Sequence, residues 1–154
     1  MSDMTINIIM GLLLVGALVL NIYVKYRRSK KTPLGRVASI LMNINHNEKF
    51  VESFSYHHGI GRMKTDAWNK FKDKIDFLPQ DLRQMLSQVF DMSEQVNERI
   101  NAARKFKSDS YMAGIDLSKI KTPLANTKEQ LQDWLQTNMQ NPEYQPKRRR
   151  GLFG

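Results

Sequence analysis

The side chains best suited to catalysis or metal binding in this chain are its three histidines. His57 and His58 are adjacent, and His46 precedes His57 by eleven residues. Metal ligands on a helix are spaced by three or four residues, and the nearest acids, Glu48 and Glu52, complete no such pattern with a histidine. We therefore interpret the histidine pair as part of a solvated loop. The sequence predicts no metal, no cofactor and no enzyme, with a histidine-dependent enzyme as a remote alternative.

Two further features bear on site chemistry. Gly59-Ile60-Gly61-Arg62 looks like a turn that cradles phosphate, but such a turn follows a buried strand and needs a further glycine, and the sequence provides neither. We interpret these glycines as the end of a helix. The chain also contains no cysteine, which excludes disulfides, thiolate metal sites and cysteine nucleophiles.

Positive charge is concentrated in two short runs. The first, here called the basic flank, consists of Lys25, Arg27, Arg28, Lys30 and Lys31. The second, here called the basic run, consists of Lys147, Arg148, Arg149 and Arg150. The net charge is +9, yet residues 32–146 hold 15 Lys and Arg against 14 Asp and Glu. The part between the runs is therefore almost neutral, which disfavours nucleic-acid binding by its surface.

The two runs predict different contacts. The basic flank directly follows an apolar stretch, where it sets membrane orientation and attracts anionic lipid. The basic run is followed by Leu152 and Phe153, so charged and apolar side chains together suit an anionic lipid surface. The alternatives for this run are nucleic acid phosphates, an acidic partner, and a solvated tail without a specific role.

The apolar stretch of residues 4–24 predicts a transmembrane helix. It has no charged side chain, and Thr5, Asn7 and Asn21 lie near its ends. A helix of this length spans about 31 Å, which matches the hydrocarbon thickness of a bilayer. A cleaved signal peptide would carry positive charge before its apolar run, whereas Asp3 comes first here and no Lys or Arg precedes residue 25.

The same charge asymmetry predicts the orientation of the chain, because basic residues that flank a span stay on the cytoplasmic side. We expect residues 1–3 outside, the single span at 4–24, a basic juxtamembrane linker at 25–31, and everything after the span in the cytoplasm. A bacterial inner membrane suits a protein of this plan.

Apolar periodicity predicts that residues 32–141 form a cytoplasmic bundle of about four helices. Thr32-Pro33 is typical of a helix start. The polar cluster Asn43 to Asn47 indicates a break or a weak stretch in the first helix. Residues 50–56 also alternate as a strand would, but a lone strand has no partner, so we favour helix. Thr65 is expected to cap the second helix.

Spacing extends this prediction to the rest of the bundle. The second helix carries one apolar stripe, formed by Trp68, Phe71, Ile75 and Leu78. The third begins at Pro79 and carries a seam with seven-residue spacing, formed by Leu82, Val89, Val96 and Ala103, with Met85, Leu86, Met92 and Ile100 beside it. A turn is expected at 107–114. The fourth begins at Thr122-Pro123, carries Leu124, Leu131, Trp134, Leu135 and Met139, and closes at Asn141-Pro142.

Large aromatic and sulfur-containing side chains on these stripes read as packing residues rather than as ligand platforms. We assign Trp68 and Trp134 to the core, and we likewise interpret Met85, Met92 and Met112 as packing residues.

Together these patterns predict an all-α fold, with a single transmembrane helix followed by a small antiparallel bundle and a basic disordered tail at 142–154. The function that suits this plan is a membrane-anchored interaction or tethering module, or an accessory subunit of a membrane complex. Its partners would be the bilayer and another protein. The alternative is contact with anionic lipid or nucleic acid through the tail.

Overall fold

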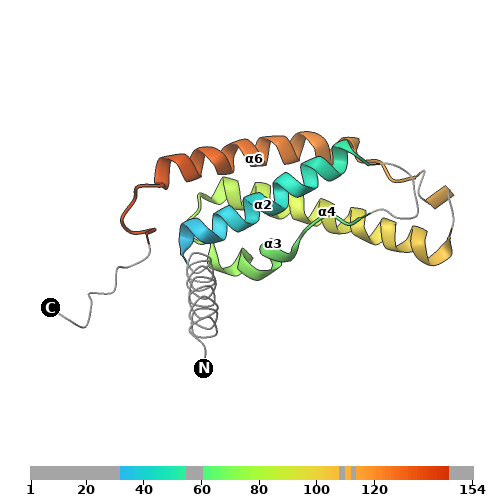
Figure 1. The fold of residues 1–154 in the computed structure, drawn as a ribbon, viewed down its shortest axis with the longest axis horizontal. Helices are drawn as coiled ribbons and strands as arrows, with labels where there is room; N and C mark the ends of the chain where they lie inside the picture. Colours follow the sequence, from blue (N-terminus) through green and yellow to red (C-terminus); the bar gives the residue numbers. More distant parts are fainter. Residues whose placement is uncertain (1–31, 55–60, 108–109, 112–113, 146–154) are drawn as a thin grey trace, which may run out of the picture.

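The computed structural model describes residues 32–54, 61–107, 110–111 and 114–145. These residues are helical or irregular, without a strand, so the all-α prediction is confirmed. The elements described in full are α2 (Pro33–Glu52), α3 (Asp66–Phe71), the 3-10 helix η1 (Lys72–Lys74), α4 (Gln80–Phe106) and α6 (Ser118–Asn138) (Figure 1). In this part of the chain, no helix is long and apolar enough to cross a membrane. The predicted span at 4–24 lies outside it.

The elements form an antiparallel bundle in which the second member is only partly helical. α6 packs on both α2 and α4, and α3 packs on α2. α2 and α4 run in one direction, and α6 runs in the other (Figure 1). Residues 61–78 return along α2, because Arg36 bonds to Lys74 at one end while Asn47 bonds to Lys64 at the other. The predicted helical bundle is therefore confirmed.

Helix α2 starts as predicted but does not break. Thr32 is its N-cap, and its hydroxyl accepts a 3.1 Å hydrogen bond from the Gly35 N–H. The expected weak stretch at Asn43 to Asn47 is continuous helix. The reason is that Asn43 and Asn47 are buried on the inner face, where tertiary partners satisfy their amides.

Three asparagines hold the irregular backbone that leads into α3. Asn47 accepts from the Lys64 N–H at 2.5 Å and donates to the Lys64 carbonyl at 2.9 Å. From α4, Asn97 accepts from the Met63 N–H at 2.8 Å and donates to the Met63 carbonyl at 3.0 Å. Asn43 accepts from the Ala67 N–H at 2.9 Å. An asparagine side chain presents one donor and one acceptor side by side, so it pairs with backbone as a neighbouring strand would.

The second helix is much shorter than its stripe suggests. Trp68, Phe71, Ile75 and Leu78 are all buried, as predicted. However, α3 has only six residues, and the stripe continues through η1 and a turn. Thr65 occupies the N-cap position without a side-chain cap bond, and its hydroxyl instead accepts from the Asn69 amide at 3.3 Å.

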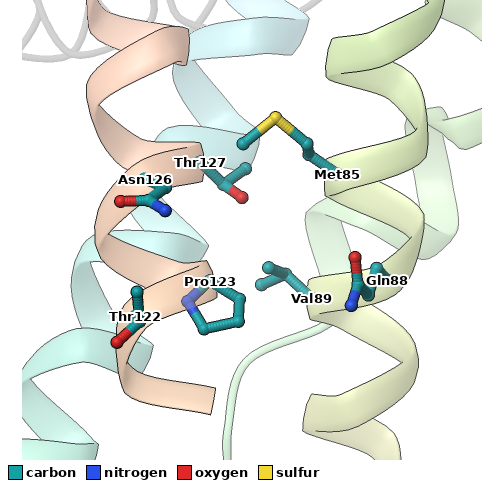
Figure 2. A pocket seen from close by; sticks show the side chains of 7 residues that line it. All are labelled: Met85, Gln88, Val89, Thr122, Pro123, Asn126 and Thr127. Carbon is teal, nitrogen blue, oxygen red and sulfur yellow. The ribbon is translucent and has the colours of Figure 1, made fainter. Parts of the chain in front are cut away.

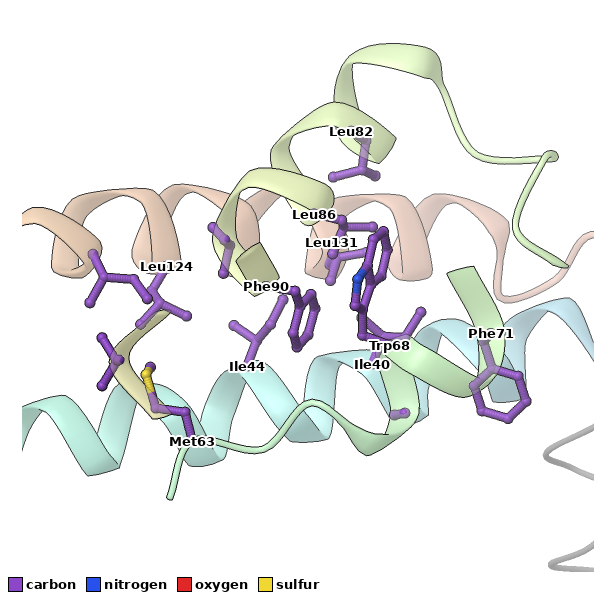
Figure 3. Packing of buried hydrophobic residues seen from close by; sticks show 14 of the residues in the cluster. Ile40, Ile44, Met63, Trp68, Phe71, Leu82, Leu86, Phe90, Leu124 and Leu131 are labelled. Carbon is purple, nitrogen blue, oxygen red and sulfur yellow. The ribbon is translucent and has the colours of Figure 1, made fainter. Parts of the chain in front are cut away.

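Helix α4 carries the predicted seam. Leu82, Val89, Val96 and Ala103 are buried, as are Leu86 and Ile100, while Met85 and Met92 are half-buried at the edges. In the core, Trp68 stacks on Phe90 with ring centroids 5.1 Å apart and an interplanar angle of 5° (Figure 3). The helix ends at Lys107, whose φ of 46° lies in the left-handed region, so the predicted turn begins there.

Helix α6 begins earlier than the predicted start at Thr122-Pro123. The helix begins at Ser118, and Pro123 lies inside it rather than at its first position. Leu117 and Ile120 are buried and extend the apolar stripe toward the N-terminus. Burial of this extra stretch outweighs the preference for a helix start at Thr122, even though Pro123 cannot donate an intrahelical hydrogen bond.

Candidate functional site

The histidines form no recognisable site in the described structure. His46 is exposed on α2, and His57 and His58 lie outside the described residues. Across residues 32–54, 61–107, 110–111 and 114–145, no group of three His, Cys, Asp or Glu side chains could hold a metal ion. The irregular segment that includes Gly61 is held by Asn47 and Asn97 in the way described above, which gives it a structural role.

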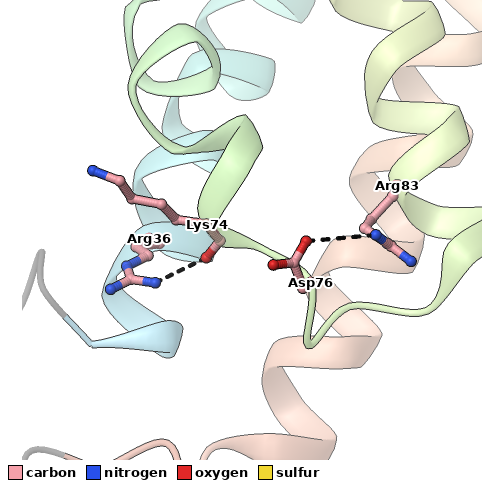
Figure 4. A network of polar contacts seen from close by, with 4 residues as sticks. All are labelled: Arg36, Lys74, Asp76 and Arg83. Atoms are coloured by element: carbon pink, nitrogen blue, oxygen red, sulfur yellow. Dashed lines mark hydrogen bonds and ion pairs between the residues drawn. The ribbon is translucent and has the colours of Figure 1, made fainter.

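The first candidate site is the end of the bundle at which the described chain begins and ends, here called the base (Figure 1). It consists of the first turn of α2, residues 72–79, and residues 134–145. The Arg36 guanidinium donates to the Lys74 carbonyl at 2.8 Å, and Arg83 lies 3.7 Å from the Asp76 carboxylate (Figure 4). These contacts connect the starts of α2 and α4 through the segment that follows η1.

Three aromatic rings close the base. Phe77, Trp134 and Tyr144 contact one another with centroid distances of 5.4 to 5.6 Å. The chain folds back after α6 through a turn in which the Tyr144 N–H donates to the Asn141 carbonyl at 3.1 Å. Trp134 is therefore half-buried in this cluster rather than in the central core.

Two predictions about this region change. Met139 was expected on the buried stripe of α6, but it is 59% exposed because the helix has ended by that residue. The tail was expected to be disordered from residue 142, whereas residues 142–145 turn back and Tyr144 packs against Phe77 and Trp134.

The base is also where the described chain begins and ends. Thr32 precedes α2 at this end, and Tyr144 and Gln145 follow α6 at the same end (Figure 1). The basic flank (Lys25, Arg27, Arg28, Lys30, Lys31) directly precedes Thr32, and the basic run (Lys147, Arg148, Arg149, Arg150) begins two residues after Gln145. Both runs lie outside the described residues, but the residues to which they connect, Thr32 and Gln145, lie at the same end of the bundle (Figure 1).

A second candidate is a groove between α4 and α6. It has a volume of about 180 Å³ and is lined by Met85, Gln88, Val89, Thr122, Pro123, Asn126 and Thr127 (Figure 2). Thr127 is fully buried, and its hydroxyl has no hydrogen-bond partner in the structure. This hydroxyl lies on the side of α6 that faces α4 (Figure 2).

Electrostatic effects in the described structure are local. Lys128 and Glu48 form a half-buried ion pair of 2.5 Å that connects α6 to α2. At the start of α6, hydrogen bonds from the Ser118 side chain and backbone lower the pKa of the Asp116 carboxyl, which is exposed. The Ser118 N–H lies 2.9 Å from that carboxylate. This bond satisfies a donor at the helix N-terminus, which is the role of a capping side chain.

No protein-family model, curated protein or solved structure matches this chain.

The expected bundle of four antiparallel helices already implies that the chain enters and leaves at one end. The ring cluster that closes the base was not predicted, because residues 142–145 were expected to be disordered. Thr127 carried a usable signal, because Ile120, Leu124, Thr127 and Leu131 continue one helical stripe. A hydroxyl at a stripe position is buried and must find a partner.

Proposed function

We propose that this chain is a single-pass membrane protein whose helical bundle stands with its base toward the cytoplasmic membrane surface and binds a protein partner. The uncharged stretch of residues 4–24 supports the anchor, and the basic flank supports the orientation. Only residues 25–32 separate the span from α2, and eight residues reach at most about 29 Å. The end of the bundle at which α2 begins is thereby kept near the bilayer.

The observation that carries the proposal is that the chain enters and leaves the bundle at the base. Because this end faces the membrane, the sides and the opposite end are presented to the cytoplasm. At the opposite end, Phe106 and Tyr111 are 58% and 53% exposed, and their rings stack with centroids 5.5 Å apart. Exposed aromatic side chains are enriched in protein interfaces, so this pair is the expected partner contact.

Membrane extraction and crosslinking test this proposal. The full chain should stay with membranes after carbonate washing and dissolve only in detergent, while a variant lacking residues 4–24 should be released. Crosslinking in intact membranes should recover a protein partner, and Phe106→Ser with Tyr111→Ser should abolish its recovery. Met42→Ser is the matched control, because Met42 is 65% exposed on α2. Release of the full chain by carbonate, or equal recovery by both variants, would contradict the proposal.

A second contact, between the basic run and anionic lipid, is favoured by the position of Gln145 at the base. Each Lys or Arg near an anionic surface contributes about 1 kcal/mol, and the four charges leave the bundle at the end nearest the bilayer. Trypsin should cleave after residues 147–150 more slowly in nanodiscs that contain phosphatidylserine than in pure phosphatidylcholine. High salt should remove the difference, and cleavage that is equally fast in both lipids would exclude this contact.

A further inference from the structure

The α4–α6 groove is an incomplete site, because one of its polar groups has no partner. A buried hydroxyl without a hydrogen bond is destabilising, and such groups in native proteins usually mark a missing water, ion or ligand. The Thr127 hydroxyl is fully buried, unpartnered and directed into the groove (Figure 2). The Gln88 amide on α4 and the Asn126 amide on α6 also line the groove and add further donors and acceptors (Figure 2).

The size of the groove defines what it can hold. An apolar cavity of about 150 Å³ accommodates benzene, and this groove has about 180 Å³. One aromatic ring therefore fits, with its apolar faces against Met85, Val89 and Pro123. A backbone amide beside the ring would supply the hydrogen bond that Thr127 lacks.

The charge between the groove and the base selects a basic occupant. Asp81 lies seven residues before Gln88, and Asp133 lies seven residues after Asn126. Residues seven apart share a helix face, so both exposed acids lie toward the base along the faces that carry the groove-lining amides. Two cations on the same helices already have acidic partners, since Arg83 pairs with Asp76 and Lys128 pairs with Glu48.

We propose that this groove binds the chain's own C-terminal segment, with the Phe153 ring in the groove and the basic run beside Asp81 and Asp133. The segment has the required order, because residues 147–150 are basic and Leu152 and Phe153 follow. Its reach is sufficient. From Gln145 to Phe153 an extended chain covers about 26 Å, whereas the eight residues from Trp134 to Asn126 rise only about 12 Å along α6.

Docking in the groove and binding to anionic lipid use the same charges, so the two exclude each other. The anionic lipid content of the membrane would then decide whether the groove is occupied. This regulatory step rests on the proposed lipid contact, but docking itself does not.

The docking is tested by disulfide trapping in the full chain, which has no native cysteine. One variant carries Gln88→Cys with Gly151→Cys. The control carries Met42→Cys with Gly151→Cys, since Met42 is exposed at a similar distance from the base on α2. Both are oxidised in phosphatidylcholine nanodiscs, one chain per disc, and a disulfide requires Cα atoms within about 7 Å.

The groove pair should form an intramolecular disulfide at least tenfold faster than the control pair, and adding Phe153→Ser should remove this advantage. Circular dichroism of the same samples verifies that the bundle stays folded. Equal rates for the two pairs would overturn the proposal. So would a disulfide that is absent in the single-chain discs and forms only between molecules in detergent, which would indicate a second copy as the occupant. The test also works in detergent, so it is independent of whether residues 4–24 span a membrane.

Discussion

The two sides of α4 differ in whether the polar side chains packed there have hydrogen-bond partners. On the side that faces residues 61–67, Asn97 pairs with both backbone groups of Met63, and across the segment Asn47 pairs with both backbone groups of Lys64. On the side that faces α6, the Thr127 hydroxyl is equally buried but has no partner.

The difference indicates that polar side chains inside this molecule have two distinct roles, one in holding the fold and one in binding. On the first side, irregular backbone needs partners, and the asparagines provide them, so the polar groups specify the fold. On the second side, both elements are helical, so no irregular backbone there needs the Thr127 hydroxyl as a partner. This hydroxyl is therefore available for a role in binding.

The largest effect is expected for Asn47→Ala. This change leaves the Lys64 N–H and carbonyl, whose bonds to Asn47 are part-buried, without these partners. At about 1 kcal/mol or more for each lost bond, and with the fully buried Asn47 side chain removed, the free energy of unfolding should fall by about 2–3 kcal/mol. Thermal unfolding followed by circular dichroism measures it. The matched control is Asn69→Ala, an exposed asparagine that should change stability by less than about 0.5 kcal/mol. Equal losses of stability in the two variants would contradict the structural role that we assign to Asn47.

A smaller loss is expected for Tyr144→Ala at the base. The Tyr144 ring contacts both Phe77 and Trp134, and each aromatic pair contributes about 0.5–1.5 kcal/mol. Stability should fall by about 1–2 kcal/mol, and Trp134 emission should shift to longer wavelength when measured in a Trp68→Phe background. Unchanged emission would show that the ring cluster does not close the base.

The sharpest test of the comparison is Thr127→Val, because it has the opposite sign to Asn47→Ala. Valine keeps the shape of threonine and removes the unpartnered hydroxyl, so the free energy of unfolding should rise by about 1 kcal/mol in a chain that lacks Phe153. Thermal unfolding of the single and double variants measures it. A loss of stability in that background would mean that the hydroxyl has a partner within the fold.

The smallest effect concerns Asp116. Its pKa in the folded state is lowered by hydrogen bonds from Ser118, so ionised Asp116 stabilises the fold above the unfolded pKa of about 4, and this contribution is lost as the pH falls through the lowered value. Asp116→Asn should therefore flatten the acid limb of the stability profile below about pH 4 and leave its slope near pH 7 unchanged. Matching acid limbs would refute the assignment.

The sequence was sufficient for the elements whose burial follows one regular stripe. The seam of α4 is the best case, because seven-residue spacing over Leu82 to Ala103 leaves little choice of face. It was insufficient where a tertiary contact reverses a local preference. Asn43 and Asn47 look like a helix break, and only the backbone of residues 64–67 opposite them explains their place in continuous helix.

The two Thr-Pro pairs make the same point. Thr32-Pro33 starts a helix and Thr122-Pro123 does not, although the local sequence signals are alike. The difference lies in what precedes them, since buried Leu117 and Ile120 extend α6 toward the N-terminus. The groove and the ring cluster at the base escaped prediction for a related reason, because both exist only once separate segments of the chain have packed together.

The shared exit at the base also sets how the bundle would respond to mechanical load. A pull between the proposed membrane anchor and a ligand bound to the tail would act on the start of α2 and the end of α6, two helices that pack together in antiparallel orientation (Figure 1). Such a force opens the two helices from one end, like a zipper, rather than shearing their whole interface at once. The ring cluster of Phe77, Trp134 and Tyr144 would bear it first, so this small group of contacts sets the force at which the bundle begins to open.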